Sequence, residues 1–317
     1  MHNYIKIIFA GTPDFAAQHL KFLLNVKNKY QIVGVLTKSD KPYGRGKKII
    51  SNPVKILAKK ANIPILQPIT MITDDIQNWI KNKKADIMIV VAYGLIIPEN
   101  ILNIFPMGSL NVHGSLLPRW RGAAPIQRSI LAGDKEIGIT IIKMDTGIDT
   151  GDILHQINCP IEIKDTSEIL QQKLLKLGPN ALLYTLDLLI SGKAKQKKQN
   201  HNFATYAKKV TKNEALINWA LSAKQIERCI RAFNPWPISY FIKNGKLIKI
   251  WDAEVINHEI NLLPGIILSS DKTGIKVSTG KGILNILKIQ EANKRILSVC
   301  DFINNNHKYF TVGKQIS

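Results

Sequence analysis

Cysteine is scarce in this sequence. The chain of 317 residues has three, Cys159, Cys229 and Cys300, and they show neither CxxC spacing nor a histidine cluster beside them. A disulfide framework needs a regular set of cysteines, and a structural zinc site needs closely spaced ligands. Neither is indicated, and we expect the three thiols to pack in the interior.

Long apolar runs are also missing. The longest, "IMIVVAYGLII" from Ile87, is too short to span a bilayer, which takes about 20 residues. The N-terminal stretch "MHNYIKIIFAGTPDF" lacks the long uncharged segment of a signal peptide. We therefore expect a soluble, cytoplasmic protein that does not bind membranes.

Acidic residues are few compared with basic ones. Asp and Glu total 23 against 44 Lys and Arg, which gives a net charge of +21. Such an excess is typical of proteins that bind phosphate-rich partners. The chain is also rich in Ile, Lys and Asn, whose codons are A/T-rich, so genome composition is an alternative source of some lysines.

A glycine fingerprint for dinucleotides is absent. The first apolar segment ends in "FAGTPDF", where Pro13 stands in place of a second glycine that could approach a pyrophosphate. A dinucleotide-dependent oxidoreductase is therefore disfavoured. We interpret Gly11, Thr12 and Pro13 as a structural turn between a strand and a helix.

Apolar segments alternate with helical patterns in the first half of the chain. Residues 5–9, 30–37 and 86–95 predict buried strands, and the segments between them predict helices. This order is typical of an α/β fold with a doubly wound, mostly parallel sheet, Rossmann-like in type. Further on, Asp165 and Glu168 suggest a capping box for a helix that ends at Gly178, and another helix ends at Gly192.

The remaining pattern predicts three regions. Residues 1–192 would form the α/β domain, and residues 193–209 a basic, exposed linker. Residues 210–317 begin with a helix whose apolar stripe includes Cys229, and continue as short alternating strands separated by turns. We expect these strands to form a small C-terminal β-barrel that is OB-like.

Chemistry-bearing residues gather after one apolar segment. Asn111 and His113 are two apart, so at a strand end they share one face, where ligands of parallel sheets bind. Asp145 and Asp149 bracket the loop "DTGID". A carboxylate beside His113 would hold its tautomer and stabilise imidazolium. A turn-forming role is equally open for each aspartate.

Several motifs carry a family resemblance. They are "NVHGSLLPRWRGAAPIQ", "DTGIDTGD", "FAGTPDFAA", "KPYGRGKK", "VVAYGLIIP" and "LSAKQIERCIRAFNPWP". In them the chain resembles the formyltetrahydrofolate-dependent formyltransferases over essentially its whole length, and among these the members that formylate initiator tRNA.

The resemblance implies a reaction and its catalytic residues. The formyl group of 10-formyltetrahydrofolate would pass to the α-amino group of methionyl-initiator tRNA, giving N-formylmethionyl-tRNA. Asn111 and His113 would point at the formyl oxygen, and Asp149 would orient His113 and a water molecule that relays the proton. The reaction that the resemblance implies requires no metal ion.

Binding residues follow from the same resemblance and from charge clustering. The folate would contact Ser115, Leu116, Leu117, Pro118, Val91, Tyr93, Gly94 and Asp145. The tRNA would contact Lys41, Arg45, Lys47 and Lys48, and in the linker Lys193, Lys195, Lys197 and Lys198. Arg119 and Arg121 could meet the folate tail or the tRNA, or could face solvent in a turn. We expect Trp236 to be a packing wedge and the protein to be a monomer.

Three other functions compete. A formyltransferase acting on an amino sugar nucleotide or a purine precursor would share the catalytic set, but it would not need a lysine-rich linker and a second domain. A non-catalytic RNA-binding protein would have lost catalytic residues, yet Asn111, His113 and Asp149 are all present. The charge therefore favours an RNA acceptor.

Overall fold

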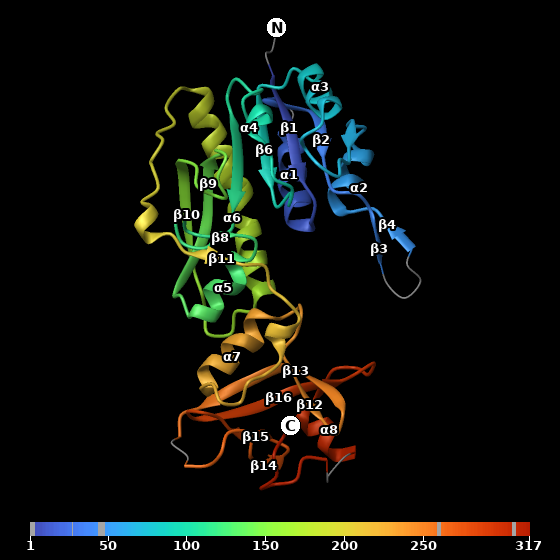
Figure 1. Ribbon diagram of the computed structural model, residues 1–317, viewed down its shortest axis with the longest axis vertical. Helices are drawn as coiled ribbons and strands as arrows, with labels where there is room; N and C mark the ends of the chain where they lie inside the picture. Colours follow the sequence, from blue (N-terminus) through green and yellow to red (C-terminus); the bar gives the residue numbers. More distant parts are fainter. Residues whose placement is uncertain (1–3, 27, 44–47, 259–260, 306–308) are drawn as a thin grey trace. The chain divides into compact units, whose positions relative to one another are not determined.

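The computed structural model describes residues 4–26, 28–43, 48–258, 261–305 and 309–317 (Figure 1). The chain divides into two compact units. The N-terminal unit comprises Met1–Pro125, Glu136–Pro160 and Gln171–Lys208. The C-terminal unit comprises Ile126–Lys135, Ile161–Leu170 and Lys209–Ser317. Within the described residues, no helix combines the length and apolarity that crossing a lipid bilayer requires.

A seven-stranded sheet organises the N-terminal unit, in the order β10-β9-β7-β6-β1-β2-β5. Its strands are β1 (Ile5–Gly11), β2 (Tyr30–Leu36), β5 (Ile65–Leu66), β6 (Ile87–Val91), β7 (Ser109–His113), β9 (Glu136–Lys143) and β10 (Ile153–Pro160). The first five run parallel to one another, and β9 runs antiparallel to its two neighbours, β7 and β10. Every residue of β6 is buried, as a strand covered on both faces requires. The predicted mostly parallel α/β sheet is confirmed.

Six helices lie among the described residues before position 191. They are α1 (Asp14–Asn25), α2 (Pro53–Lys60), α3 (Asp74–Asn82), α4 (Glu99–Leu102), α5 (Pro125–Ala132) and α6 (Ser167–Ile190). Of these, α5 falls almost wholly in the C-terminal unit. A hairpin that the sequence did not predict, β3 (Lys41–Tyr43) with β4 (Lys48–Ile50), flanks the glycine-arginine segment. Arg45 and Lys47 lie outside the described residues.

The helix α6 corrects the prediction of two separate helices in this part of the chain. It does not stop at Gly178 but continues through Pro179, which lies inside it. The reason for the glycine is close packing, because a Cβ on Gly178 would lie 2.4 Å from Nε2 of His19 on α1. The local sequence of Gly178 and Pro179 is typical of a helix end, but here the glycine is needed for packing between two helices.

Capping of α6 also differs from the predicted box. A carboxylate oxygen of Asp165 accepts from the backbone N–H of Glu162 at 2.8 Å and so closes the preceding turn. The hydroxyl of Thr166 accepts from the N–H of Ile169 at 3.3 Å, which makes Thr166 the capping residue.

An antiparallel sheet forms most of the C-terminal unit, as expected from the short alternating strands. Its order is β12-β13-β16-β15-β14, with β17 paired to β16. The elements are α7 (Ala223–Ala232), β12 (Tyr240–Lys243), β13 (Lys246–Ile256), β14 (Ile267–Asp271), β15 (Gly274–Ser278), β16 (Ile283–Glu291), β17 (Leu297–Ser298) and α8 (Val299–Asn305).

The helix α7 begins with the capping box of Ser222 and Gln225, and it buries Ile226 and Ile230 against the sheet. Cys229 on the same helix is half-buried, as is Cys300, so only Cys159 is a fully buried thiol as predicted.

Residues 193–208 are tied to the N-terminal unit by backbone pairing. The strand β11 (Tyr206–Ala207) pairs in parallel with β8 (Arg121–Gly122). Upstream, Lys197 exchanges two backbone hydrogen bonds with Ile153 of β10, at 2.8 and 2.9 Å. The expected linker is therefore an attached segment over much of its length.

Candidate active site

The sheet brings an amide and an imidazole to one edge. The strands β6 and β7 are parallel neighbours, with Val90 paired to Asn111, so their carboxyl ends meet. Asn111 and His113 are alternate residues of β7 and share a face. The loop between β9 and β10 then carries Asp149 to the same place, where its side chain is 13% exposed and that of His113 is 6% exposed.

Three groups surround the carboxylate of Asp149. Asn111 donates from Nδ2 to Oδ1 at 2.9 Å, and the backbone N–H of Gly122 donates to Oδ2 at 2.8 Å. Nδ1 of His113 lies 3.4 Å from Oδ2. The structure thus brings together all three residues to which the sequence assigned catalysis.

The orientation of the His113 ring follows from its other contact. Nε2 lies 2.8 Å from the carbonyl oxygen of Trp120. A carbonyl oxygen only accepts, so Nε2 carries a proton and Nδ1 is the atom that faces Asp149. Nδ1 is therefore the ring atom placed to exchange a proton beside the carboxylate.

Asp145 and Asp149 differ in their surroundings. Oδ1 of Asp145 accepts from the N–H of Gly147 at 3.1 Å and from the hydroxyl of Thr150 at 2.5 Å. Asp145 therefore holds the turn of the loop, while Asp149 faces the imidazole. Asp149 itself has a positive φ of 53°, an uncommon conformation for a residue with a side chain.

The predicted folate segment, Ser115–Pro118, uses much of its polar backbone within the protein. The N–H of Leu117 donates to the hydroxyl of Thr140 at 3.1 Å, and this hydroxyl donates to the carbonyl of Ser115 at 2.6 Å. The amide of Gln156 donates to the carbonyl of Leu117 at 2.9 Å. Each carbonyl keeps a second lone pair, but the segment is less open than the sequence suggested.

The end of β6 presents backbone rather than side chains. Val91 is buried, and the hydroxyl of Tyr93 donates to the sulfur of Met71 at 3.4 Å, with burial raising the pKa of Tyr93. Gly94 has a φ of 76°, and a Cβ there would lie 2.7 Å from Nζ of Lys38. Sequence reasoning missed Lys38, although its place just after β2 marks it as a strand-end residue.

Arg121 is not a solvent-facing arginine. Its side chain is among the largest that are fully buried. The guanidinium donates from Nη2 to Oε1 of Gln199 at 2.7 Å, and Nη1 lies 3.2 Å from Nδ1 of His201. Sequence reasoning missed Gln199 and His201 because they lie in a polar segment. Arg119 is exposed, with its guanidinium carbon 4.5 Å from the ring centroid of Trp120.

The basic residues assigned to tRNA are described only in part. Lys41 and Lys48 lie in β3 and β4. The four lysines of the attached segment are exposed: Lys193, Lys195, Lys197 and Lys198. Trp236, predicted to be a packing wedge, is 49% exposed, so that prediction is wrong.

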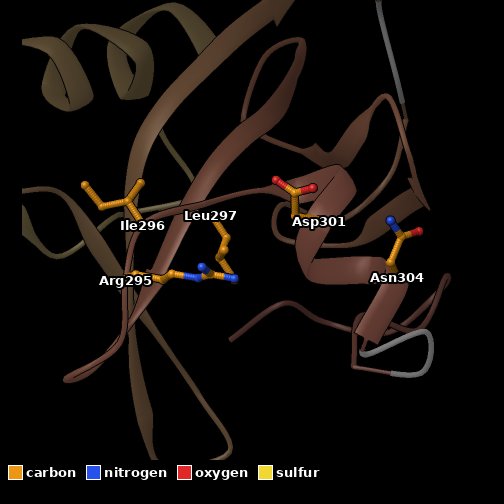
Figure 2. A pocket seen from close by; sticks show the side chains of 5 residues that line it. All are labelled: Arg295, Ile296, Leu297, Asp301 and Asn304. Atoms are coloured by element: carbon orange, nitrogen blue, oxygen red, sulfur yellow. The ribbon is translucent and has the colours of Figure 1, made fainter.

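A separate hollow lies in the C-terminal unit, beside β17 and α8 (Figure 2). It is lined by Arg295, Ile296, Leu297, Asp301 and Asn304. None of these residues was assigned to a site from the sequence.

An amide, an imidazole and a carboxylate at the edge of a parallel sheet suit an enzyme that stabilises a developing anion and moves a proton, as acyl transfer requires. Residues 4–186 match the family described as "Formyl transferase", and residues 209–307 match "Formyl transferase, C-terminal domain". The chain belongs to the formyl transferase family.

Solved structures with the same fold include enzymes with different acceptors. WlaRD, described as a sugar 3N-formyl transferase and solved with dTDP and 5-N-formyl-THF, is 25% identical, with a TM-score of 0.65 over 92% of this chain and 100% of its own. The N-formyltransferase from Helicobacter canadensis, in complex with folinic acid and dTDP-3-aminofucose, is 22% identical, with a TM-score of 0.63 over 89% and 99%. The methionyl-tRNA formyltransferase from Clostridium thermocellum is 20% identical, with a TM-score of 0.57 over 88% and 100%.

Proposed function

We propose that this formyltransferase moves the formyl group of 10-formyltetrahydrofolate to the α-amino group of methionyl-initiator tRNA. The main observation that supports formyl transfer is the contact of Asn111 and His113 with the carboxylate of Asp149. The net charge of +21 supports an RNA acceptor. A folate donor is supported by the family and by the formylated folate in the WlaRD structure.

The reaction is an acyl transfer without a covalent enzyme intermediate. The neutral amine attacks the formyl carbon, and negative charge grows on the formyl oxygen while the nitrogen becomes positive. Nδ2 of Asn111 has a second hydrogen beyond the one donated to Asp149, and it would stabilise that oxygen. The proton lost by the amine would pass through His113 and Asp149, with a water molecule, to N10 of the departing folate.

The folate would bind beside the carboxyl ends of β6 and β7. Gly94 has no side chain of its own and lies against Nζ of Lys38, and the carbonyl of Leu117 can accept one further hydrogen bond. Because the backbone of Ser115–Pro118 is fixed by Thr140 and Gln156, this edge is preorganised for a flat, polar ring.

Fewer observations bear on the acceptor than on the formyl donor. Four exposed lysines, at 193, 195, 197 and 198, lie on the segment that pairs with β10 and β8. Such a cluster suits a phosphate backbone, because each contact releases counterions. The alternative acceptor is an amino sugar nucleotide, and its support is the likeness to WlaRD over 92% of this chain.

A direct transfer assay separates these acceptors. The protein, with 10-formyltetrahydrofolate, is given methionyl-initiator tRNA, a dTDP-linked amino sugar or a glycinamide acceptor, and release of tetrahydrofolate is followed. We expect turnover with the tRNA at a kcat/KM at least about tenfold above the others, a difference of about 1.4 kcal/mol in transition-state binding. If only the dTDP-linked amino sugar were formylated, the proposed tRNA acceptor would be wrong and the amino sugar would be the acceptor.

A further inference from the structure

We propose that Gln199 is a positioning residue for the Asp149 carboxylate, and that the attached segment therefore completes the active site. This inference rests on the proposed function for its effect on turnover. Its structural part concerns only contacts within the N-terminal unit, which contains Arg121, Asp149 and Gln199.

The side chain of Gln199 has both ends occupied. Its Nε2 donates to the backbone carbonyls of Asp149 and Gly151, each at 2.8 Å. Its Oε1 accepts from Nε and Nη2 of Arg121, at 3.1 and 2.7 Å. Arginine has no acceptor, so it sets the orientation of the amide and directs both N–H groups to the loop. Gln199 is 6% exposed, so these bonds are shielded from water.

The two carbonyls belong to the strained residue of the loop, Asp149, and to Gly151, two residues further on. Asp149 has a φ of 53°, which a residue with a side chain adopts only when its surroundings hold it there. Gly151 allows the loop to approach β9, because a Cβ there would lie 1.8 Å from the carbonyl oxygen of Lys143. With its own carbonyl and that of Gly151 fixed, the backbone that carries the Asp149 side chain has little freedom to move away from His113.

Arg121 connects Gln199 to the motif "NVHGSLLPRWRGAAPIQ", which also contains Asn111 and His113. It is followed by Gly122, whose N–H donates to Oδ2 of Asp149 at 2.8 Å. The backbone of Asp149 is thus held through Gln199, and its side chain through Gly122. Loss of either support should let the carboxylate move relative to the imidazole, and a displacement of about 1 Å can cost about 100-fold in rate.

Two variants separate the donors of Gln199 from its contact with Arg121. Gln199→Leu removes both, whereas Gln199→Glu keeps an acceptor for Arg121 but loses the two donors. The matched control is Gln290→Leu in the C-terminal unit, where the amide binds Trp251 and the carbonyl of Lys294. Asp149→Ala shows the effect of losing the carboxylate altogether.

Amide hydrogen exchange measured by NMR gives a readout that does not depend on activity. We expect the N–H of Gly122 to exchange at least about tenfold faster in both Gln199 variants, and the N–H of Ala123, which donates to Ala207 of β11, to stay protected. If both amides lose protection together, β11 has detached and the role of Gln199 is only structural. Unchanged exchange at Gly122 overturns the proposal.

Steady-state kinetics gives the second readout. We expect kcat to fall about 10- to 100-fold in both Gln199 variants, with KM for the formyl donor within about twofold and with the control unchanged. Wild-type kcat in Gln199→Glu would contradict the role of the donors. If the wild-type protein transferred no formyl group to any acceptor, the proposed function would fail, while the exchange at Gly122 would still decide the role of Gln199.

Discussion

At the scale of single residues, the imidazole of His113 is the group whose removal should separate chemistry from binding. His113→Ala removes the ring beside Asp149 but leaves every lysine in place. We expect turnover to fall about 10²- to 10³-fold, as for other groups that transfer a proton in the transition state, with affinity for the proposed tRNA acceptor nearly unchanged. Single-turnover kinetics and a filter-binding titration measure the two quantities. An equal loss of both would assign His113 a structural role instead.

The spacing of Asn111 and His113 was enough to place them on one face, because residue alternation in a strand is local. The choice between Asp145 and Asp149 was not accessible in this way. It depends on the path of a loop that Gln199, distant in sequence, fixes through two carbonyls. Polar residues in a loop give no periodic signal, so Gln199 and Arg121 could not be assigned from the sequence.

His19 should make stability depend on pH. It is fully buried on α1, with Nδ1 bonded to the carbonyl of Phe15 at 2.7 Å, and burial lowers the pKa of His19 to about 4. The unfolded chain binds this proton near pH 6.5, so the folded state loses stability as the pH falls from about 6.5 to about 4, by up to about 3 kcal/mol.

Urea unfolding at pH 7.5 and pH 5 tests this dependence. His19→Gln, which does not titrate, should lose less stability between the two pH values than the wild-type protein. Equal losses in the two proteins would show that other groups cause the acid sensitivity.

At the scale of elements, α6 should be sensitive at its glycine. Gly178→Ala adds a Cβ that would lie 2.4 Å from Nε2 of His19, so the intrinsic helix preference of alanine is outweighed. We expect a loss of about 1–3 kcal/mol in the free energy of unfolding. The double variant His19→Ala/Gly178→Ala should lose less than the two single variants combined, because the clash is absent. Strict additivity would show that the contact is unimportant.

The elements that the sequence predicted well are those defined by burial on both faces. Strands β1, β2 and β6 are short, largely apolar segments, and their length and flanking turns distinguish them from the helical patterns with which they alternate. The end of a helix is set by weaker local preferences, and in α6 a packing contact overrides them. The strands β8 and β11 have two residues each, which is too short for a periodic side-chain pattern, so the sequence does not predict that they pair.

At the scale of the whole molecule, the charge of +21 should make the proposed binding of tRNA strongly dependent on salt. Replacing Lys193, Lys195 and Lys198 by Gln should weaken binding at low salt and flatten its decline with rising salt, because fewer counterions are released. The control replaces three exposed lysines of α1, α2 and α3, Lys21, Lys60 and Lys81, by Gln. The affinity is measured between 50 and 200 mM salt, over which the Debye length falls from about 14 to about 7 Å. The slope of the logarithm of the affinity against the logarithm of the salt concentration is then compared between the two variants. Identical slopes for the two variants would show that only the total charge of the protein matters, and that the three lysines of the attached segment have no special role.

The attachment of residues 193–208 bears on how this protein could be shortened or recombined. A fragment ending at residue 192 would keep Asn111, His113 and Asp149, yet it would leave behind the glutamine that fixes the loop and the strand that pairs with β8. Chimeras that exchange acceptor specificity within the family are therefore best joined after Lys208, where the N-terminal unit ends.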